Sequence, residues 1–238
     1  MDSRIEALRD TIRSSDNIVF FGGAGVSTES GIPDFRSTSG LYSQKYAHPP
    51  ETMLSHGFFM QNTAEFYRFY RDKMVYPDAK PNAAHFKLAE LESEGRLKAV
   101  VTQNIDNLHQ MAGSRRVYEL HGSVHRNFCM KCGAPYPVEH IMGSEGIPRC
   151  GCGGTVKPDV VLYDEPLNQE VMSGAAAAIA EADVLIVGGT SLNVYPAAGL
   201  LRYYQGGKLI LINKSELPHE RNAVLVIRGS IGEVLGQV

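Results

Sequence analysis

Short apolar runs that alternate with helical patterns constrain the fold of this 238-residue chain more than any other feature. The run at residues 17–21 leads directly into a glycine-rich turn. A continuous apolar run is typical of a strand buried on both faces of a parallel sheet. Similar runs lie at 99–102, 117–120, 160–163, 184–187, 209–212 and 224–227, and helical patterns lie between several of them, at 82–94, 168–182 and 196–205. The alternation predicts an α/β fold with a doubly wound, Rossmann-like parallel sheet.

Two segments interrupt this alternation, and we expect them to form a smaller lobe against the sheet. Residues 37–81 contain no strand run but carry an aromatic stripe at helical spacing, and residues 123–157 contain all the cysteines. The predicted Rossmann-like domain therefore comprises residues 1–36, 82–122 and 158–238. At its start, Ser3-x-x-Glu6 predicts a capping box for a helix that buries Ile5, Leu8 and Ile12.

The cysteines form two close pairs with the spacing of a metal site. Seventeen residues separate Cys129-x-x-Cys132 from Cys150-x-Cys152. Four thiolates leave a tetrahedral Zn²⁺ ion no open position, which is the mark of a structural site. A redox dithiol or a chance cluster is the alternative. We expect one structural zinc ion, bound by Cys129, Cys132, Cys150 and Cys152.

The charge balance argues against a surface built for a polyanion. The chain has 23 basic and 26 acidic side chains, for a formal net charge of −3. We therefore expect no direct binding of nucleic acid. The amino-terminal segment is charged throughout, and no apolar run is long enough to cross a bilayer. A cytoplasmic protein with reduced thiols and no membrane association is the expectation.

A glycine-rich turn, Gly23-Ala-Gly25, follows the first apolar run and precedes a predicted helix. Glycines let the backbone approach a pyrophosphate, and a helix N-terminus supplies free N–H groups. Thr28 replaces the third glycine of the dinucleotide fingerprint, so the match to the dehydrogenase pattern is imperfect. Phe35 and Arg36, a few residues later, could shield and orient a ribose or a nicotinamide. A structural turn and an ordinary surface loop are the alternatives.

Polar residues also follow four other runs: Gln103-Asn-Ile-Asp106, His121-Gly122, Gly188-Gly-Thr-Ser191 and Asn213. Because the carboxyl ends of parallel strands meet at one edge of a sheet, we expect these residues to converge there. An imidazole with a pKa near 6.5 suits general-base work at neutral pH, so His121 is the predicted base. The residues at 188–191 and Asn213 suit an adenine and its ribose, or else a structural turn. No G-x-x-x-x-G-K-[ST] motif is present, which argues against a P-loop NTPase.

Together these motifs resemble the sirtuin family of NAD-dependent protein lysine deacylases, in its short bacterial form. The resemblance rests on residues 23–36, 102–106, 121–122, 189–192 and 194–196 and on the four cysteines, in the family's order. It implies that NAD is consumed as a co-substrate. The acetyl group of acetyl-lysine would pass to ADP-ribose, with release of nicotinamide and O-acetyl-ADP-ribose. Acetylated proteins or peptides are the implied partners.

The same resemblance assigns roles to residues. His121 is implied to be the base acting on the ribose hydroxyls, and Asn104 the second catalytic residue, which orients the ribose and a water. The diphosphate would lie on the 23–28 turn and the nicotinamide near Asp106. The implied NAD contacts are Ala24, Gly25, Thr28, Phe35, Arg36, Gln103, Asn104, Ile105, Asp106, His121, Gly189, Thr190, Ser191, Asn213 and Ile231.

For the substrate, the resemblance implies a peptide that adds as a β-strand near 163–165 and 192–194. Val161, Tyr163 and Val194 would line an apolar tunnel for the lysine stem. Asp164 departs from the family, because many members have Phe-Gly-Glu at this place. An acidic side chain there could favour basic residues in the substrate.

The acyl preference follows from a second departure. Family members that remove succinyl groups carry a tyrosine and, three residues later, an arginine. Here Tyr67 is followed at that position by Tyr70, with Arg68 and Arg71 on either side of it. A shift of one residue turns a helical side chain by about 100°, so neither arginine should serve as a clamp. We therefore expect a deacetylase in preference to a desuccinylase.

Three other functions stay open at this point. Removal of longer acyl groups and mono-ADP-ribosyl transfer would use the same NAD site. A zinc-bearing binding module is the non-enzymatic alternative. The oligomeric state is not predicted by the sequence, although we favour a monomer.

Overall fold

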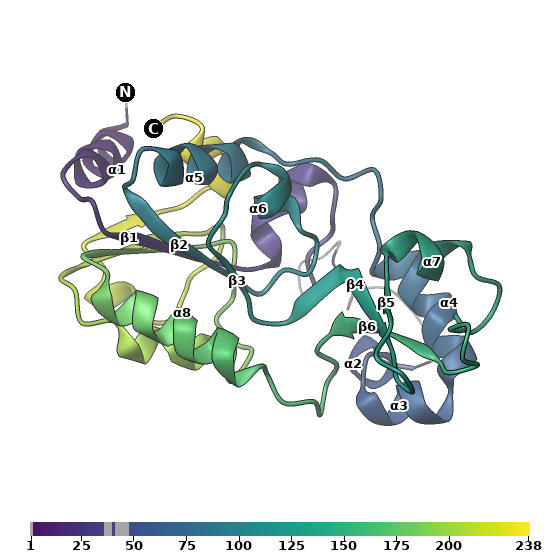
Figure 1. The fold of residues 1–238 in the computed structure, drawn as a ribbon. Helices are drawn as coiled ribbons and strands as arrows, with labels where there is room; N and C mark the ends of the chain where they lie inside the picture. Colours follow the sequence, from purple (N-terminus) through teal and green to yellow (C-terminus); the bar gives the residue numbers. More distant parts are fainter. Residues whose placement is uncertain (1, 36–39, 41–47) are drawn as a thin grey trace.

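A computed structural model describes residues 2–35, 40 and 48–238. Its centre is a sheet of six parallel strands in the order β3-β2-β1-β7-β8-β9 (Figure 1). These strands are β1 (Ile18–Gly22), β2 (Leu97–Thr102), β3 (Val117–Glu119), β7 (Val184–Gly188), β8 (Lys208–Ile212) and β9 (Leu225–Ile227). The order runs outward in both directions from β1 and β7, as in dinucleotide-binding sheets. The predicted doubly wound parallel sheet is confirmed.

Helices cover both faces of the sheet (Figure 1). One face packs against α1 (Ser3–Arg13), α5 (Ala83–Ser93) and α9 (Ile231–Leu235), with α6 (Leu108–Met111) beside them, and the other against α8 (Gln169–Glu181) and the 3₁₀ helix η4 (Ala197–Tyr203). Phe20 of β1 belongs to the first core and Phe21 to the second. Successive side chains of a strand point to opposite faces, so a strand covered on both sides must be apolar throughout.

The register of the strands brings the ends of four strands to one level. Gly22 of β1 lies opposite Thr102 of β2 and opposite Gly188 of β7. Ile212 of β8 in turn lies opposite Gly188. The residues that follow these positions therefore begin at the same edge of the sheet, around the point where the strand order reverses.

A smaller lobe lies at one end of the sheet (Figure 1). It contains the antiparallel strands β4 (Gly122–Cys129), β5 (Pro135–Tyr136) and β6 (Val156–Val160) and the helices α2 (Pro50–Met53), α3 (His56–Gln61), α4 (Thr63–Lys73) and α7 (Val138–Gly143). Both predicted insertions contribute to one apolar core, in which Phe66 and Tyr70 of α4 accompany Ile141 and Val156. The exact limits of the domains remain a prediction, and the small sheet extends from 122 to 160, slightly beyond the expected 123–157.

One expectation about a strand and one about a helix cap were wrong. The run at 160–163 does not join the parallel sheet: β6 ends at Val160 in the small sheet, and Tyr163 pairs with Ser55 in an isolated bridge. A run of four apolar residues cannot by itself distinguish these two sheets. The cap of α1 is Asp2 and not Ser3, because the Asp2 carboxylate accepts a hydrogen bond from the backbone N–H of Arg4 at 2.9 Å.

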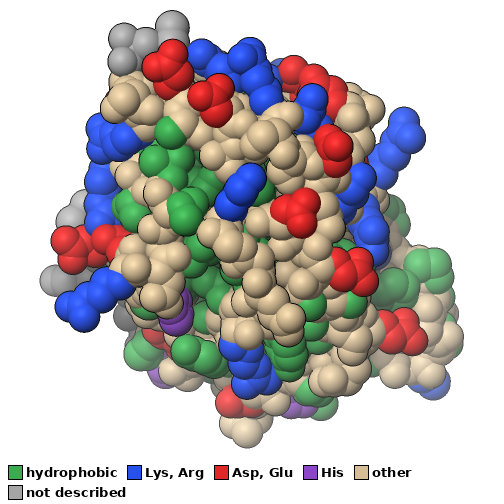
Figure 2. Space-filling view, turned by 90° about the vertical axis from the view of Figure 1, so that its left-hand side faces the viewer, with side chains coloured by type: hydrophobic (Ala, Val, Ile, Leu, Met, Phe, Trp, Pro, Cys, Tyr) green, Lys and Arg blue, Asp and Glu red, His purple; other side chains and the backbone are tan. Residues whose placement is uncertain are grey.

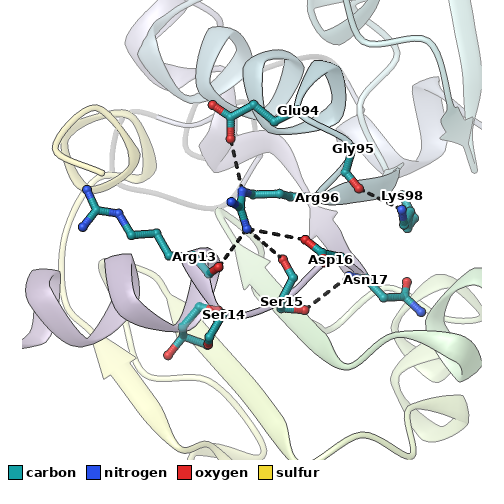
Figure 3. A network of polar contacts seen from close by, with 10 residues as sticks. Arg13, Ser14, Ser15, Asp16, Asn17, Glu94, Gly95, Arg96 and Lys98 are labelled. Carbon is teal, nitrogen blue, oxygen red and sulfur yellow. Dashed lines mark hydrogen bonds and ion pairs between the residues drawn. The ribbon is translucent and has the colours of Figure 1, made fainter.

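Arg96 joins two connections at the amino-terminal edge of the sheet (Figure 3). Its Nη1 donates to the carbonyl of Arg13 at 2.8 Å and lies 3.5 Å from the Asp16 carboxylate, while its Nε lies 3.3 Å from Glu94. One guanidinium thus links the α1–β1 turn to the α5–β2 turn. This cluster stabilises the edge of the sheet opposite the strand ends described above.

Two buried histidines make the stability of the fold depend on pH. The rings of His85 and His109 lie 4.7 Å apart, and both side chains are buried. Burial lowers the pKa of His85 to about 4 and that of His109 to about 3. The unfolded chain binds protons at these residues from pH 6.5 downward, whereas the folded protein does not. The free energy of unfolding should therefore fall with pH below about 6.5, by about 1.4 kcal/mol per pH unit and histidine.

Urea melts between pH 5 and 7 measure this slope, and a variant isolates its origin. His109→Leu should reduce the pH dependence of the free energy of unfolding by the contribution of one histidine, because leucine does not titrate. His219→Asn, at an exposed residue, should leave it unchanged. Comparison with the variant cancels other acid effects, such as loss of a metal ion. An unchanged slope in His109→Leu would contradict the assignment.

The described side chains of both charges are interspersed on the end of the molecule that carries the chain termini. Basic and acidic side chains alternate there around apolar ones (Figure 2). Among the described residues, no helix is both long and apolar enough to cross a membrane.

Candidate active site

A cavity of about 780 Å³ lies where the strand ends of the large sheet meet the small lobe. Segments that follow β1, β2, β7 and β8 form one wall, and residues of the small lobe form the other. Lining residues that were expected to bind NAD are Ala24, Gly25, Thr28, Phe35, Gln103, Asn104, Ile105, Asp106, His121, Gly189, Thr190, Ser191, Asn213 and Ile231. The expected substrate residues Val161, Tyr163 and Val194 line it as well. Arg36 lies outside the described residues.

The glycine-rich turn packs directly on the loop after β7. The N–H of Gly25 donates to the carbonyl of Gly189 at 2.8 Å, and a Cβ on Gly25 would lie 2.8 Å from the Gly189 Cα. Gly189 itself has a φ of 60°. Side chains at either position would force the two loops apart, so glycine is required at both. The approach leaves the backbone of the turn bare toward the cavity.

The expected helix after this turn is replaced by two short 3₁₀ helices within residues 24–30. These are η1 (Ala24–Val26) and η2 (Thr28–Ser30). The N–H groups of Gly25, Val26 and Ser27 already donate to backbone carbonyls, and two single turns have little of the dipole of a full α-helix. Anion binding here therefore depends on the shape of the turns themselves.

Ser27 organises the floor of the cavity, and sequence reasoning did not single it out. Its Oγ donates to the Asp106 carboxylate at 2.6 Å and accepts a hydrogen bond from the Asn104 amide at 2.9 Å. Burial raises the pKa of Asp106, while the bond from Ser27 acts against the increase. The sequence signal that could have identified Ser27 is its place inside the glycine-rich motif. The network fixes an acceptor and an amide side by side.

His121 has its two ring nitrogens in different roles. Nδ1 lies 3.0 Å from the carbonyl of Gln103, so it must carry the proton and donate. Nε2 is then left as an acceptor, and the ring lines the cavity. Burial lowers the pKa of His121, with the Gln103 carbonyl partly opposing this effect. A neutral imidazole with a fixed tautomer can accept a proton at neutral pH.

The backbone beside His121 is tightly determined. The carbonyl of His121 accepts a hydrogen bond from the N–H of Val161 at 3.0 Å. At Gly122 φ is 76°, and a Cβ there would lie 1.9 Å from the carbonyl oxygen of Asp159. The glycine lets β4 turn directly from the cavity edge of the large sheet into the small sheet. His121 therefore lies at the junction of the two sheets.

The loops after β2 and β7 are also joined. The Gln103 amide donates to the Thr190 hydroxyl at 3.0 Å, and the same hydroxyl accepts from the N–H of Leu192 at 3.2 Å. Gln103 thus contacts His121 through its carbonyl and Thr190 through its side chain. Movement of one loop would disturb the other.

The mouth of the cavity is formed by the segment after β6. The N–H of Tyr163 donates to Leu54 and its carbonyl accepts from His56, both at 2.9 Å. Glu165 accepts hydrogen bonds from the side chains of His56 at 2.8 Å and Lys157 at 3.0 Å. These contacts, together with a bond from the Leu162 N–H, lower the pKa of Glu165 against the effect of burial.

These bonds leave fewer backbone groups for the predicted pairing with a substrate strand near 163–165. The N–H and the carbonyl of Tyr163 already have partners. The N–H of Glu165 is also occupied, since it donates to the Leu162 carbonyl at 3.0 Å. Among the described residues, none is hydrogen-bonded to the backbone N–H of Asp164. Asp164 lies at the mouth, is exposed, and has a φ of 72°.

Part of the cavity wall was not predicted. Met74 and Val75 after α4 and Val138 and Met142 of α7 line the cavity. They belong to two segments far apart in the sequence that only the fold brings together. No local pattern distinguishes them from other apolar residues of the same segments. This wall extends the cavity into the small lobe.

The two tyrosines and two arginines of α4 lie outside this wall. Tyr67 is buried, and its hydroxyl donates to the carbonyl of Val156. Arg71 donates to the carbonyls of Ile141 at 2.7 Å and Gly146 at 2.6 Å. Both side chains are committed to structural contacts. None of Tyr67, Arg68, Tyr70 and Arg71 lines the cavity.

The four cysteines cluster at the far side of the small lobe, and their sulfur atoms lie within 4.8 Å of one another. Individual separations are 3.5 Å for Cys129 and Cys152 and 3.6 Å for Cys132 and Cys150. A tetrahedron with Zn–S bonds of about 2.3 Å has sulfur atoms about 3.8 Å apart. The cluster therefore has the size and the donor set of a closed zinc site, and no described residue offers a fifth ligand to it.

Comparison with known proteins identifies the family. The family model described as the Sir2 family matches residues 23–196, which include the glycine-rich turn, His121 and the cysteines. The chain belongs to the Sir2 family. An NAD-dependent protein deacetylase of Clostridium acetobutylicum is 60% identical over 99% of this chain and 98% of its own length. One of Cutibacterium acnes is 54% identical over 98% of this chain and 96% of its own length.

Solved Sir2 structures have the same fold. A Sir2 enzyme described for its mechanism and regulation superposes with a TM-score of 0.88 at 42% identity, over 100% of this chain and 96% of that one. A Sir2 complex with p53 peptide and NAD⁺ gives a TM-score of 0.84 at 39% identity, over 97% and 95% of the two chains. A Sir2 variant solved with a deacetylated p53 peptide and 3′-O-acetyl ADP ribose gives a TM-score of 0.91 at 39% identity, over 99% and 97% of the two chains.

Proposed function

We propose that this member of the Sir2 family is an NAD-dependent protein lysine deacetylase that releases nicotinamide and O-acetyl-ADP-ribose. The observation that supports this most strongly is the single cavity in which a bare glycine-rich turn, the Ser27–Asn104–Asp106 network and the free Nε2 of His121 come together. NAD supplies an activated ribose with nicotinamide as the leaving group. The residues supply binding, orientation and a base.

In this proposal each wall of the cavity has one task. The 23–28 turn receives the diphosphate, and Thr190, Ser191, Asn213 and Ile231 surround the adenosine. Asp106, held by Ser27, receives the nicotinamide carboxamide beside Phe35 and Ile105. Asn104 orients the ribose and a water, and Nε2 of His121 accepts the proton of a ribose hydroxyl. The acetyl-lysine enters between Val161, Tyr163 and Val194.

A mass-spectrometric assay tests the proposal against its closest alternative. Incubation with an acetylated peptide and NAD should convert the peptide to its free-lysine form, and omission of NAD should stop the reaction. Mono-ADP-ribosyl transfer would instead add mass to a protein and leave the acetyl group in place. That outcome, or loss of acetyl without NAD, would refute the proposed function.

The apolar cavity wall contributed by the small lobe favours a second activity, the removal of longer acyl groups at the same site. Met74, Val75, Val138 and Met142 extend the cavity with apolar side chains. A longer alkyl chain gains about 0.8 kcal/mol for each buried CH₂ group. Turnover of a series of peptides with acyl chains of increasing length measures how far this wall is used.

Acetyl-lysine should be preferred over succinyl-lysine by at least about tenfold in kcat/KM, since a buried carboxylate without a partner loses more than about 1.4 kcal/mol. The arginines and tyrosines of α4 do not reach the cavity, and Lys73, which does, pairs with Asp72 at 3.1 Å. Two versions of one peptide, compared under the same conditions, provide the measurement. Equal or faster removal of succinyl would contradict the expected preference.

Asp164 should make the enzyme prefer peptides with lysine or arginine beside the acetyl-lysine. Its exposed carboxylate lies at the mouth, in a left-handed conformation that favours glycine. Asp164→Asn keeps a side chain that tolerates this conformation and removes the charge. The ratio of kcat/KM between a basic and a neutral peptide should fall several-fold in this variant at low salt. A ratio equal to that of the wild type would rule out the role.

We place the enzyme in the cytoplasm, where thiols stay reduced, and treat it as a monomer that binds peptides and not nucleic acid. Light scattering of the purified protein checks the monomer. A gel shift at physiological salt checks the absence of nucleic-acid binding.

A further inference from the structure

Asn82 caps helix α5 and contacts the glycine-rich turn at the same time. Its Oδ1 accepts a hydrogen bond from the N–H of Ala84 at 2.9 Å, which is the usual work of a cap. Its Nδ2 donates to the carbonyl of Val26 at 2.8 Å and to the hydroxyl of Ser30 at 2.9 Å. The amide thus uses its oxygen for the helix and its nitrogen for the turn.

The two bonds to the turn span the residue that organises the cavity floor. Val26 ends η1 and Ser30 ends η2, and Ser27 lies between these two 3₁₀ turns. On its cavity side, Ser27 is bonded to Asp106 and Asn104. Asn82 therefore holds the turn from behind at two points while Ser27 is engaged in front. The shape of residues 24–30 depends on both sets of bonds.

Asn82 is itself fixed by its surroundings. Its backbone N–H donates to Nδ1 of His85 at 3.2 Å, which completes the capping box. His85 is fully buried against His109, whose ring in turn lies 6.2 Å from that of Phe20 in β1. Asn82 thus sits on a packed layer of rings. It presents its amide to the turn from a rigid base and not from a mobile loop.

We propose that Asn82 is a positioning residue that holds the glycine-rich turn in the shape that binds the NAD diphosphate. This inference rests on the proposed function, because it takes the ligand of the turn to be NAD. Without the amide, the turn must be ordered by the ligand, and the cost of that ordering appears as weaker binding. In the proposed function the acetyl-peptide binds near Val161, Tyr163 and Val194, none of which is bonded to Asn82, so its affinity should not depend on Asn82.

Asn82→Ser is the informative variant, since serine keeps the cap but is too short to reach the turn. KM for NAD should rise about tenfold, which corresponds to about 1.4 kcal/mol. We expect kcat at saturating NAD and KM for the peptide to change by less than about twofold, because an interaction that only improves NAD binding leaves both unaltered. Asn82→Asp, which keeps the cap oxygen and the shape but loses both N–H groups, should act in the same direction.

Asn168→Ser provides a matched control. Asn168 caps α8 by accepting hydrogen bonds from Glu170 and Val171, and it does not line the cavity. The same change of cap should leave KM for NAD at the wild-type value. Ser30→Ala removes one of the two acceptors and should raise KM for NAD less than Asn82→Ser does. In the double variant Asn82→Ser with Ser30→Ala, the two effects should not add.

Equal KM values for NAD in wild type and Asn82→Ser would overturn the inference. So would a fall in kcat together with a lower melting temperature and no change in KM, which would give Asn82 a purely structural role. NAD affinity measured by calorimetry separates this test from the proposed function. If the wild type binds NAD but does not deacetylate, the proposed function fails, and weaker NAD binding by Asn82→Ser still supports the positioning role.

Discussion

Replacing His121 by alanine should lower kcat for deacetylation by roughly 10²–10⁴-fold, the range expected when a general base is lost. NAD binding should change little, because the turn and the Ser27–Asn104–Asp106 network do not depend on the imidazole. Steady-state kinetics with an acetylated peptide and calorimetry with NAD measure the two quantities. The melting temperature should stay close to that of the wild type.

The pH dependence of the wild type gives an independent check. His121 must be neutral to accept a proton, and burial lowers its pKa below 6.5. The rate should therefore be lost as the pH falls through that lowered pKa and be retained at pH 7. His219→Asn is the control, since His219 is exposed and does not line the cavity. Retained turnover in His121→Ala would refute the role of this histidine.

Removing the metal should unfold the small lobe and abolish activity. Cys129 and Cys150 are part of the lobe's apolar core, along with Ile141 and Val156. Structural zinc contributes about 10–16 kcal/mol to the folding of zinc-finger peptides at neutral pH, so its loss should destabilise this lobe strongly. Val138 and Val160 of the same lobe line the cavity, so its loss would open one wall of the site.

Cys132→Ala tests this expectation, because Cys132 is exposed and contributes little beyond its thiolate. We expect it to bind substoichiometric zinc, to melt at a lower temperature and to lose deacetylation. Met130→Ala, at an exposed residue in the same hairpin, should keep one zinc per chain and full activity. A metal-free protein that stays folded and active would show that the cysteines do not form a structural site.

The parallel sheet could be predicted because its strands are apolar on both faces. Phe20 and Phe21 pack into different cores, and such a strand leaves a continuous apolar run in the sequence. The run at 160–163 is equally apolar but is covered by the small lobe, so composition alone assigned it to the wrong sheet. The cap of α1 was misplaced for a similar local reason, since Asp2 and Ser3 are both good capping residues.

The convergence of the site residues followed from one topological rule. Gln103, His121 and Asn213 each come directly after a run, and parallel strands bring such positions to one edge. Met142 and Asn82 could not be found in this way. Met142 reaches the cavity through the packing of the small lobe, and Asn82 reaches the turn from a helix cap, which sequence reasoning takes as local. Their roles depend on tertiary contacts between distant segments.

The two ends of the chain lie next to each other, at the end of the molecule farthest from the small lobe (Figure 1). Arg9 in the first helix donates a hydrogen bond to the carbonyl of Gln237, which joins them. A tether at either end would therefore attach the enzyme through its large domain, at the end away from the small lobe. Immobilised in this way, the protein would keep the small lobe, whose residues line one wall of the cavity, clear of the support.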